Sequence, residues 1–340
     1  MLEVVTMGEM MVRLMPLHNL RFEQASEFRA FYGGDESIVA SSLARFGINS
    51  AYLTKLPESP FGQAALMALR QQGVSTEFVI RGGERLGLNF YENGAAIRPS
   101  RVVYDRKHSA MAESMADEFD FEGALEGAKW FHVSGITPAL SSSCLETTRT
   151  ALITARRLGL TVSFDLNYRS KLWSPAEAQK ALIPLMEYVD VCIGNEEDTQ
   201  NALGVAPTNT NVLQAQLDLE SYAEVFSRLK REYGFAFVAG TLRESLSASD
   251  NGWSVVLYDG TELYQSRHYS IHLVDRGGGG AAFSGALIYG FLMNWDPQRI
   301  VDFAGAASAL KQTVLGDFNL VDKEEVEEVM KGNLSGRVQR

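Results

Sequence analysis

The chain has 340 residues and a formal net charge of −11, and 46% of its residues are hydrophobic while 21% are charged. This length and composition allow one large α/β domain, or one domain with an insertion, around a sizeable core, and the acidic balance argues against nonspecific nucleic-acid binding, which needs a basic face. The sequence has no apolar run of the ~20 residues that a membrane span requires and no basic start typical of a signal peptide. Its two cysteines have neither metal-ligand nor disulfide spacing, so a reduced cytoplasmic setting is expected.

Strands and helices alternate along most of the chain. The predicted strands are short apolar runs, and several predicted helices carry apolar residues at helical spacing with a glycine directly after them. This alternation is typical of a parallel sheet with crossover helices on its faces. The strands expected are residues 4–8, 51–53, 77–80, 130–135, 160–166, 189–193 and 235–239, and the helices are residues 39–46, 61–72, 141–157, 213–233, 281–294, 296–310 and 323–331.

Two stretches of the first half depart from this alternation. Residues 13–32 lack helical periodicity and place aromatic and charged residues in loose alternation, which indicates exposed strands. Residues 85–107 contain alternating apolar residues on both sides of Asn93-Gly94, a dipeptide typical of a hairpin turn. We expect the two stretches to form a small β-sheet lid. The large α/β domain would then comprise residues 1–12, 33–84 and 108–340.

Polar side chains follow three of the predicted strands, at the point where each strand ends. Ligands of open α/β sheets bind at the carboxyl ends of the strands, so these side chains are candidates for a common site. They are Asp165, Asn167 and Arg169 after the first strand, Asn195, Glu197 and Asp198 after the second, and Gly240, Thr241 and Arg243 after the third.

Residues 277–280 are four consecutive glycines that lead directly into an apolar helix. Glycine lets backbone N–H groups approach a ligand closely, and a helix start adds unpaired donors and the positive end of the helix dipole. The stretch therefore predicts an anion cradle with phosphate as its natural ligand, while a flexible linker or tight turn is the alternative. Gly33 and Gly34, also at a helix start, are a second site of close approach.

Residues 275–285 resemble the signature of the ribokinase-like (PfkB) carbohydrate kinases, Asp-Thr-x-Gly-Ala-Gly-Asp-x-Phe-x-Gly. The match holds at Asp275, Gly278, Gly280, Phe283 and Gly285. In that family the glycine loop, here Gly278, Gly279 and Gly280, stabilises the transferring phosphoryl group, and the last Asp of the signature deprotonates the sugar hydroxyl. Ala281 occupies that base position in this chain. The resemblance implies a ribokinase-like three-layer α/β/α fold with a mostly parallel central sheet and a small β-sheet lid over the sugar.

Further motifs resemble the 2-keto-3-deoxygluconate kinase branch of this family. They are Tyr104-Asp105-Arg106, Asp165-Leu166-Asn167-Tyr168-Arg169 followed by Lys171-Leu172-Trp173, and residues 316–319. The resemblance implies an ATP-dependent kinase in which arginine forks bind the carboxylate of a sugar acid. The implied substrate-binding positions are Gly33, Gly34, Ile38, Asn89, Tyr104, Arg106 and Arg169. The implied nucleotide positions are Asn195, Gly240, Thr241 and Arg243 with the glycine loop, and Glu197 or Asp198 would act on Mg²⁺ through water.

These assignments have structural alternatives. Arg106 could be a surface residue at a strand end, and Asp165 and Arg169 could form a structural ion pair. Asn195 could cap a helix whose acidic first turn faces the helix dipole, with or without a role in binding.

Three departures from the family fall at pocket positions, while the scaffold motifs are intact. Ile38 replaces an Asn, Asn89 stands where the branch usually has a Tyr, and Ala281 replaces the base. One interpretation is a sugar-acid kinase that makes 2-keto-3-deoxy-6-phosphogluconate with activity impaired by the missing base. The other is a non-catalytic or regulatory ligand-binding descendant, or an engineered pocket on the same scaffold. Gluconate and galactonate epimers both fit the first interpretation, and the family resemblance makes a dimer or higher oligomer plausible.

Overall fold

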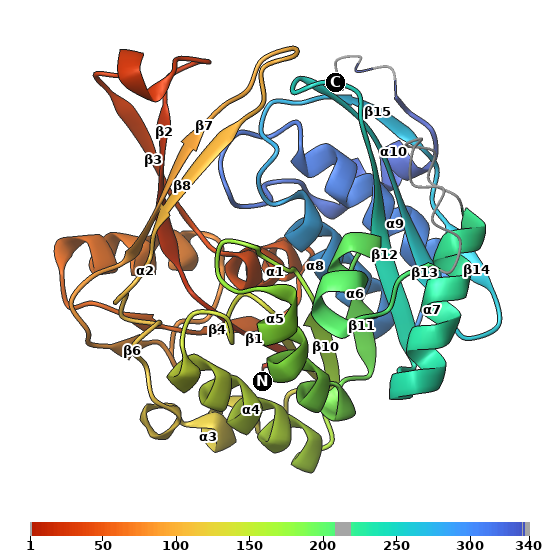
Figure 1. Ribbon diagram of the computed structural model, residues 1–340, viewed down its shortest axis with the longest axis horizontal. Coiled ribbons are helices and arrows are strands. Elements are labelled where there is room, and N and C mark those ends of the chain that lie inside the picture. Colours follow the sequence, from red (N-terminus) through yellow and green to blue (C-terminus); the bar gives the residue numbers. More distant parts are fainter. Residues whose placement is uncertain (1, 208–218, 335, 337–340) are drawn as a thin grey trace.

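The computed structural model describes residues 2–207, 219–334 and 336, and Figure 1 shows their arrangement. Among them, nine strands form one mixed sheet in the order β14-β13-β12-β11-β10-β9-β1-β4, with β15 pairing with β13. The six strands from β4 to β12 are parallel, and the pairs made by β13 are antiparallel. The strands are β1 (Val4–Met7), β4 (Ser50–Leu53), β9 (Trp130–Ser134), β10 (Thr161–Asp165), β11 (Val191–Ile193), β12 (Phe237–Ser245), β13 (Asp250–Tyr258), β14 (Leu263–Gln265) and β15 (Tyr269–His272).

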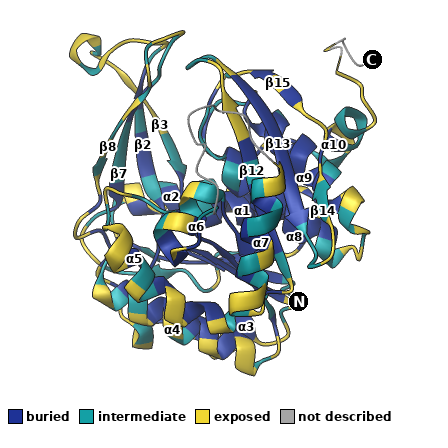
Figure 2. Ribbon diagram, turned by 45° about the vertical axis from the view of Figure 1, so that its right-hand side comes forward, coloured by how far each residue is buried: buried dark blue, intermediate teal, exposed yellow. Residues whose placement is uncertain are grey.

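The two faces of this sheet are covered by separate groups of helices, which makes three layers. Successive side chains of a strand point to opposite faces. Accordingly, Val5 belongs to a hydrophobic cluster that includes residues of α3, α4, α5, α6 and α7, while Val4 belongs to a second cluster that includes residues of α1, α8, α9 and α10. The central strands are buried on both faces (Figure 2), which explains their near-continuous apolar sequence. The helices are α1 (Asp35–Arg45), α2 (Pro60–Gln71), α3 (Phe121–Leu125), α4 (Ser142–Arg157), α5 (Pro175–Leu182), α6 (Glu196–Leu203), α7 (Leu219–Tyr233), α8 (Gly279–Leu292), α9 (Pro297–Lys311) and α10 (Lys323–Met330).

The three-layer fold predicted from the sequence is confirmed, with shifts at the ends of elements. The helix expected at residues 213–233 is described only from Leu219 onward, as α7, and residues 213–218 lie outside the described residues. The strand expected at residues 77–80 is the two-residue β6 (Ile80–Arg81), which pairs in parallel with β5 (Lys55–Leu56). Short 3-10 helices lie at Phe22–Gln24, Ala116–Glu118 and Ile183–Tyr188. No helix in residues 2–207, 219–334 and 336 is long and apolar enough to cross a bilayer.

A second, four-stranded sheet of order β3-β2-β7-β8 stands apart from the body (Figure 1). Its strands are β2 (Met11–Pro16), β3 (Phe28–Gly33), β7 (Gly87–Glu92) and β8 (Arg101–Asp105), so both stretches expected to form the lid contribute to it. The expected turn at Asn93-Gly94 is wrong. The chain turns at Ala96-Ile97, between the bridged residues Ala95 and Arg98, and Ala96 takes the positive φ of 49°.

Candidate active site

A cavity of about 510 Å³ lies between the small sheet and the carboxyl ends of the central strands. The small sheet contributes side chains from β2, β7 and β8, and the body contributes the starts of α1, α6 and α8 and the segment after β10. The predicted site residues that line this cavity are Gly33, Gly34, Ile38, Asn89, Tyr104, Arg106, Arg169, Asn195, Glu197, Asp198, Thr241, Arg243, Gly278, Gly279, Gly280 and Ala281.

Gly240 is the predicted site residue that does not line the cavity. A Cβ at this position would lie 2.6 Å from the carbonyl oxygen of Gly194 and 3.0 Å from the ring of Phe226. The glycine is therefore needed for packing of β12 against its neighbours. Packing also explains Gly34, although it lines the cavity, because a Cβ there would lie 1.9 Å from the carbonyl oxygen of Glu9.

The glycine loop forms the start of α8, as the sequence predicted. Gly278 is the N-cap residue with φ 80°, a left-handed conformation that favours glycine. Ala282 N–H donates to Gly278 O at 2.9 Å and begins the helical ladder, so the amides of residues 279–281 precede that ladder. They are at the positive end of the helix dipole and line the cavity. This arrangement can bind an anion.

A buried charge cluster holds the glycine loop from behind. Arg13 donates to both oxygens of Asp275 at 3.0 and 2.6 Å, and its Nε lies 3.1 Å from Asp317. Asp275 also accepts the backbone N–H groups of Gly277 at 2.9 Å and Gly316 at 3.0 Å. Burial raises the pKa of Asp275, but the hydrogen bonds and charge of Arg13 outweigh it and leave the pKa below its ordinary value. Asp275 is thus a support of the loop, with both oxygens engaged.

Lys311 adds a buried ammonium group to this cluster. Its Nζ donates to the carbonyl oxygens of Gly277 at 3.0 Å, Gly316 at 2.9 Å and Val314 at 3.3 Å. Burial lowers the pKa of Lys311 to about 8, against the raising effect of Asp275 and Asp317. The ammonium therefore ties the glycine loop to the segment after α9.

Three arginines on the cavity wall have no carboxylate partner within 4 Å among the described residues. Arg169 donates to Tyr168 O at 3.0 Å, and Arg276 donates to Ser247 O and Asn251 Oδ1, both at 3.1 Å. Arg243 lies over the ring of Trp253, and burial together with the charges of Arg276 and Arg169 lowers its pKa. These three guanidinium groups therefore form no close ion pair in the described residues, although carboxylates of Asp35, Asp165, Glu197 and Asp198 also line the cavity.

Arg106 differs from these three arginines. It lines the cavity, but its Nε donates to Glu9 Oε2 at 2.8 Å and a second nitrogen pairs with the same oxygen. Ser109 donates to the other oxygen of Glu9. Arg106 is buried, so it is not the surface residue of the alternative interpretation, yet its charge is balanced. The structural ion pair considered for Asp165 and Arg169 is not formed within 4 Å in the described part of the chain.

The acidic residues after β11 are arranged as a helix cap. Asn195 Oδ1 accepts Asp198 N–H at 2.9 Å, and Asp198 accepts the N–H groups of Asn195 at 3.3 Å and Tyr168 at 2.9 Å. Glu197, by contrast, is exposed on the cavity wall. No group of three side chains suited to a metal occurs in the described residues. Glu197 and Asp198 both line the cavity, so they offer the one or two carboxylates with which Mg²⁺ usually binds beside phosphate oxygens and water.

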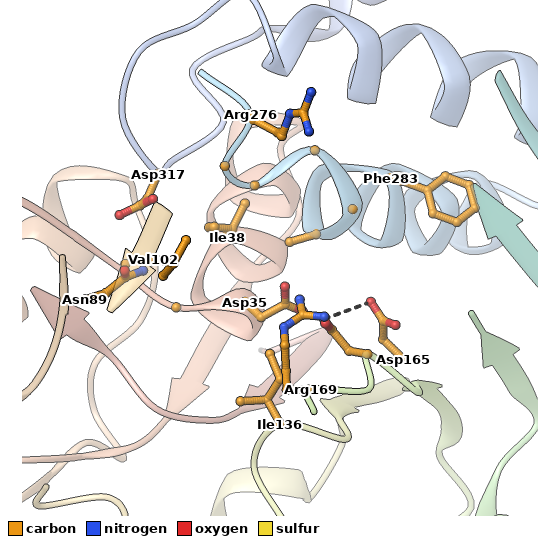
Figure 3. A pocket seen from close by; sticks show the side chains of 18 of the residues that line it. Asp35, Ile38, Asn89, Val102, Ile136, Asp165, Arg169, Arg276, Phe283 and Asp317 are labelled. Carbon is orange, nitrogen blue, oxygen red and sulfur yellow. Dashed lines mark hydrogen bonds between the residues drawn. The ribbon is translucent and has the colours of Figure 1, made fainter. Parts of the chain in front are cut away.

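The three departures from the family shape the middle of the cavity. The Cδ1 atom of Ile38 lies 3.3 Å from where Gly278 would carry a Cβ, so Ile38 packs directly against the glycine loop (Figure 3). Ala281 is buried. Asn89 lines the cavity, and its Oδ1 is buried without a hydrogen-bond partner in the part of the chain that the structure describes. Loss of polarity is therefore confined to the region beside the glycine loop.

Sequence reasoning overlooked several residues of this site. Arg13 and Lys311 were not singled out because their partners are distant in the chain. Asp317 was noted only as part of the motif at residues 316–319, and Asp35 was passed over between two family positions. Arg276 adjoins the four glycines, which was a usable signal. Asn167 was noted only as part of a motif, yet it holds a positive φ of 39°, and such strain often occurs at functional sites.

Comparisons with known proteins agree with this geometry. The family model of the pfkB family carbohydrate kinases matches residues 1–226. The 2-dehydro-3-deoxygalactonokinase of Haloferax volcanii is 36% identical over 335 residues, which is 98% of each chain. The 2-dehydro-3-deoxygluconokinase of Thermoproteus tenax is 28% identical over 336 residues, covering 97% of this chain and 95% of that one.

Solved structures give the same result. The crystal structure of 2-dehydro-3-deoxygluconokinase from Thermotoga maritima has a TM-score of 0.94 at 47% identity, covering 98% of this chain and 100% of that chain. The fructokinase of Xylella fastidiosa with bound ATP shares the fold at 20% identity, with a TM-score of 0.75 over 97% and 98% of the two chains. The fold, the family model and these relatives together establish that the chain belongs to the pfkB family of ATP-dependent carbohydrate kinases.

Proposed function

We propose that this sugar-acid kinase phosphorylates 2-keto-3-deoxygluconate (2-dehydro-3-deoxygluconate) or its galactonate epimer at the terminal hydroxyl. With the gluconate epimer the product is 2-keto-3-deoxy-6-phosphogluconate. The observation that carries the proposal is an arginine, Arg169, that has no carboxylate partner within 4 Å among the described residues and shares its cavity with the helix-start amides of residues 279–281. A planar guanidinium suits a carboxylate, and the amides suit a phosphoryl group. The kinases similar to this chain carry names with the same substrate class.

The residues of the cavity divide into two groups by this proposal. Arg169 would bind the sugar-acid carboxylate, while Tyr104, Asn89 and the start of α1 would contact the rest of the sugar. Arg106 would act mainly by positioning, because Glu9 already balances its charge. The nucleotide phosphates would lie against Gly278–Gly280, with Arg243, Arg276 and the Thr241 region beside them. The bound Mg²⁺ would neutralise phosphate charge near Asn195, Glu197 and Asp198.

Position 281 sets the rate that this proposal predicts. Phosphoryl transfer has a loose transition state, so positioning and electrostatic stabilisation supply much of the catalysis. A positioned general base adds typically ~10²–10⁴-fold, equivalent to about 3–5 kcal/mol of barrier. Ala281 cannot accept a proton, and its surroundings are apolar and buried. We therefore infer an active but slow kinase.

A non-catalytic ligand-binding role, in a natural descendant or an engineered pocket, is the second candidate. It is favoured by the apolar contact between Ile38 and the glycine loop, since Ile38 and Ala281 both remove polarity where the reacting groups would meet. Under this proposal the protein binds ATP or a sugar acid without turnover, or prefers an apolar ligand.

Calorimetry and product analysis separate the two candidates. ATP and 2-keto-3-deoxygluconate are titrated separately, and the mixture is then analysed for ADP and for a phosphorylated sugar acid. The kinase proposal predicts binding of both ligands and slow formation of equal amounts of ADP and phosphorylated product. Binding of ATP without any product over long incubation would refute it and favour the second candidate.

Exposed apolar side chains on the small sheet are relevant to the oligomeric state of the protein. Phe28 of β3 and Val103 of β8 are large apolar side chains exposed on the small sheet. We propose that small sheets of two copies pair through this surface, as the family resemblance suggested. Sedimentation analysis of the purified chain, compared with a variant carrying Phe28→Asp and Val103→Asp, tests for a dimer that dissociates in the variant.

A further inference from the structure

The carboxylates around the cavity differ in how their oxygens are engaged. Asp317 pairs with Arg13, and Asp198 accepts two backbone N–H groups. Asp165 accepts Asn167 Nδ2 at 3.5 Å. These three carboxylates thus have structural partners, and the proton transfer of a kinase would compete with those contacts.

Asp35 differs from these carboxylates in the hydrogen bonding of one oxygen. Its Oδ2 is shielded from solvent and has no hydrogen-bond partner in residues 2–207, 219–334 and 336, which is costly for a carboxylate oxygen unless a ligand uses it. The residue lines the cavity. Its neighbour Glu36 is also buried, but Glu36 points away from the cavity and accepts Ser134 N–H, Ser134 Oγ and Thr137 Oγ1 at 2.7–3.0 Å. Asp35 is therefore a cavity carboxylate whose Oδ2 has no donor among the described residues, although Asn167 provides a hydrogen bond to the carboxylate group.

Asp35 also lies on the side of α1 that faces the glycine loop. It is the first residue of α1, and Ile38 follows it by three positions, so the two side chains share one face of the helix. Ile38 packs against Gly278, and α1 packs along α8. Figure 3 shows Asp35 close to Arg169 and on the same side of Ile38 as Asp165. Asp35 therefore lies beside Arg169, on the same helix face as the residue that contacts the glycine loop.

The charges that face Asp35 suit a proton acceptor. Burial raises its pKa above the ordinary value, Arg169 and a hydrogen bond from Asn167 oppose this, and Asp198 adds to the increase. Asp165 and Glu36 add further negative charge nearby, since each interacts with Asp35. A base whose pKa is raised toward the working pH takes a proton more readily than an ordinary carboxylate.

We propose that Asp35 accepts the proton of the reacting substrate hydroxyl, in place of the carboxylate that position 281 lacks. This inference rests on the proposed kinase function. The hydroxyl oxygen forms a bond to the γ-phosphorus of ATP, while the bond between that phosphorus and the β–γ bridging oxygen breaks. The hydroxyl proton passes to Asp35 and then to solvent, and ADP leaves.

The test is a cycle of four proteins: wild type, Asp35→Asn, Ala281→Asp and the double variant. Asparagine keeps the shape of the side chain and removes its basicity. Asp35→Asn should lower the kcat of the wild type at least tenfold, with ATP affinity unchanged. In the Ala281→Asp background the same substitution should change kcat less than threefold, because the new carboxylate takes over the proton. Glu324→Gln, at an exposed position in the first turn of α10, is the control for loss of charge at a helix start.

The pH profile supplies a second readout. The wild-type kcat/KM should rise with pH through an acidic limb, and that limb should disappear in Asp35→Asn. If Asp35→Asn lowers kcat by the same factor in the wild-type and Ala281→Asp backgrounds, Asp35 does not act as the base and only binds substrate. If Asp35→Asn leaves the kcat of the wild type unchanged, Asp35 has no part in the reaction. If only Ala281→Asp turns over, the inference fails while the kinase function stands. If none of the four proteins forms product, the proposed function fails as well.

Discussion

Replacing Gly278 with alanine should destabilise the protein and distort the phosphate cradle together. At the observed φ of 80°, an added Cβ would lie 2.8 Å from Asp317 O and 3.1 Å from Lys311 Cε. The left-handed conformation costs an L-residue about 1–2 kcal/mol, and overpacking costs about 1–3 kcal/mol. The free energy of unfolding should therefore fall by about 2–5 kcal/mol, unless the loop moves and the amides of residues 279–281 turn out of the cavity.

Gly280→Ala is the matched comparison, because it adds the same methyl group two residues later. Gly280 lies in the first turn of α8 and lines the cavity, and an added Cβ would meet no atom within 4 Å. Alanine is favoured over glycine in a helix by about 1 kcal/mol, so stability should be unchanged or raised. The methyl group would occupy space beside the amides, where the phosphate is expected. ATP affinity should then fall about tenfold or more, a loss of at least ~1.4 kcal/mol.

Chemical denaturation and ATP calorimetry on both variants measure the two quantities. The expected pattern is a large loss of stability in Gly278→Ala, and a loss of ATP affinity without loss of stability in Gly280→Ala. Wild-type stability and ATP affinity in Gly278→Ala would refute the argument about loop conformation. Wild-type ATP affinity in Gly280→Ala would show that the phosphate does not lie against these amides.

Three further predictions concern the surroundings of the loop. Lys311→Met should lower the free energy of unfolding by about 3–5 kcal/mol in chemical denaturation, which is typical for the loss of one partner of a buried ion pair. Lys331→Met, at the exposed end of α10, is the control and should leave the free energy of unfolding unchanged. Equal effects of the two substitutions would refute the role of the three hydrogen bonds from Lys311 to carbonyl oxygens. Arg169→Gln should raise the KM for the sugar acid by about 10- to 100-fold, which corresponds to the loss of a charged hydrogen bond, and should leave the KM for ATP nearly unchanged. A rise in the KM for ATP alone would assign Arg169 to the nucleotide and not to the sugar acid. Burial and the charge of Asp35 raise the pKa of Glu36 to about 7, so the folded state binds this proton more tightly than the unfolded state. The resulting stability is present below the ordinary pKa and is lost as pH rises through about 7. The melting temperature of the wild type relative to Glu36→Gln should thus be higher at pH 5 than at pH 8, and a pH-independent difference would contradict the shift.

Local sequence patterns predicted the features of this protein that depend on neighbouring residues. The buried strands, the glycine loop at the start of α8 and the polar ends of β10 and β11 follow from residue spacing. The cap at Asn195 is equally local, because its partner Asp198 is three residues away. The ends of parallel strands meet at one edge of a sheet, so a common site could be predicted without knowing any distance.

Features that depend on distant contacts could not be predicted in this way. Arg13 and Asp275 are 262 positions apart, and Arg106 and Glu9 are 97 apart. The sequence alone therefore could not show which of the cavity arginines form an ion pair with a carboxylate and which do not. Gly240 shows the same limit, since a glycine required by a neighbouring backbone and one that admits a ligand look identical in sequence.

The unpartnered oxygen of Asp35 is likewise a property of the packed cavity. In the sequence, Asp35 and Glu36 are adjacent acids at a helix start, and either could be read as a response to the helix dipole. Only the fold shows that Ser134 and Thr137 engage Glu36 while Asp35 faces the cavity.

The most direct measurement of the central claim is the ratio of kcat between Ala281→Asp and the wild type, with ATP and 2-keto-3-deoxygluconate. A sugar-acid kinase that lacks its base at position 281 should form phosphorylated product slowly and should gain at least tenfold from the new carboxylate, part of the ~10²–10⁴-fold effect of a positioned base. An Ala281→Asp variant that is folded and binds ATP but shows no gain over the wild type would contradict the account.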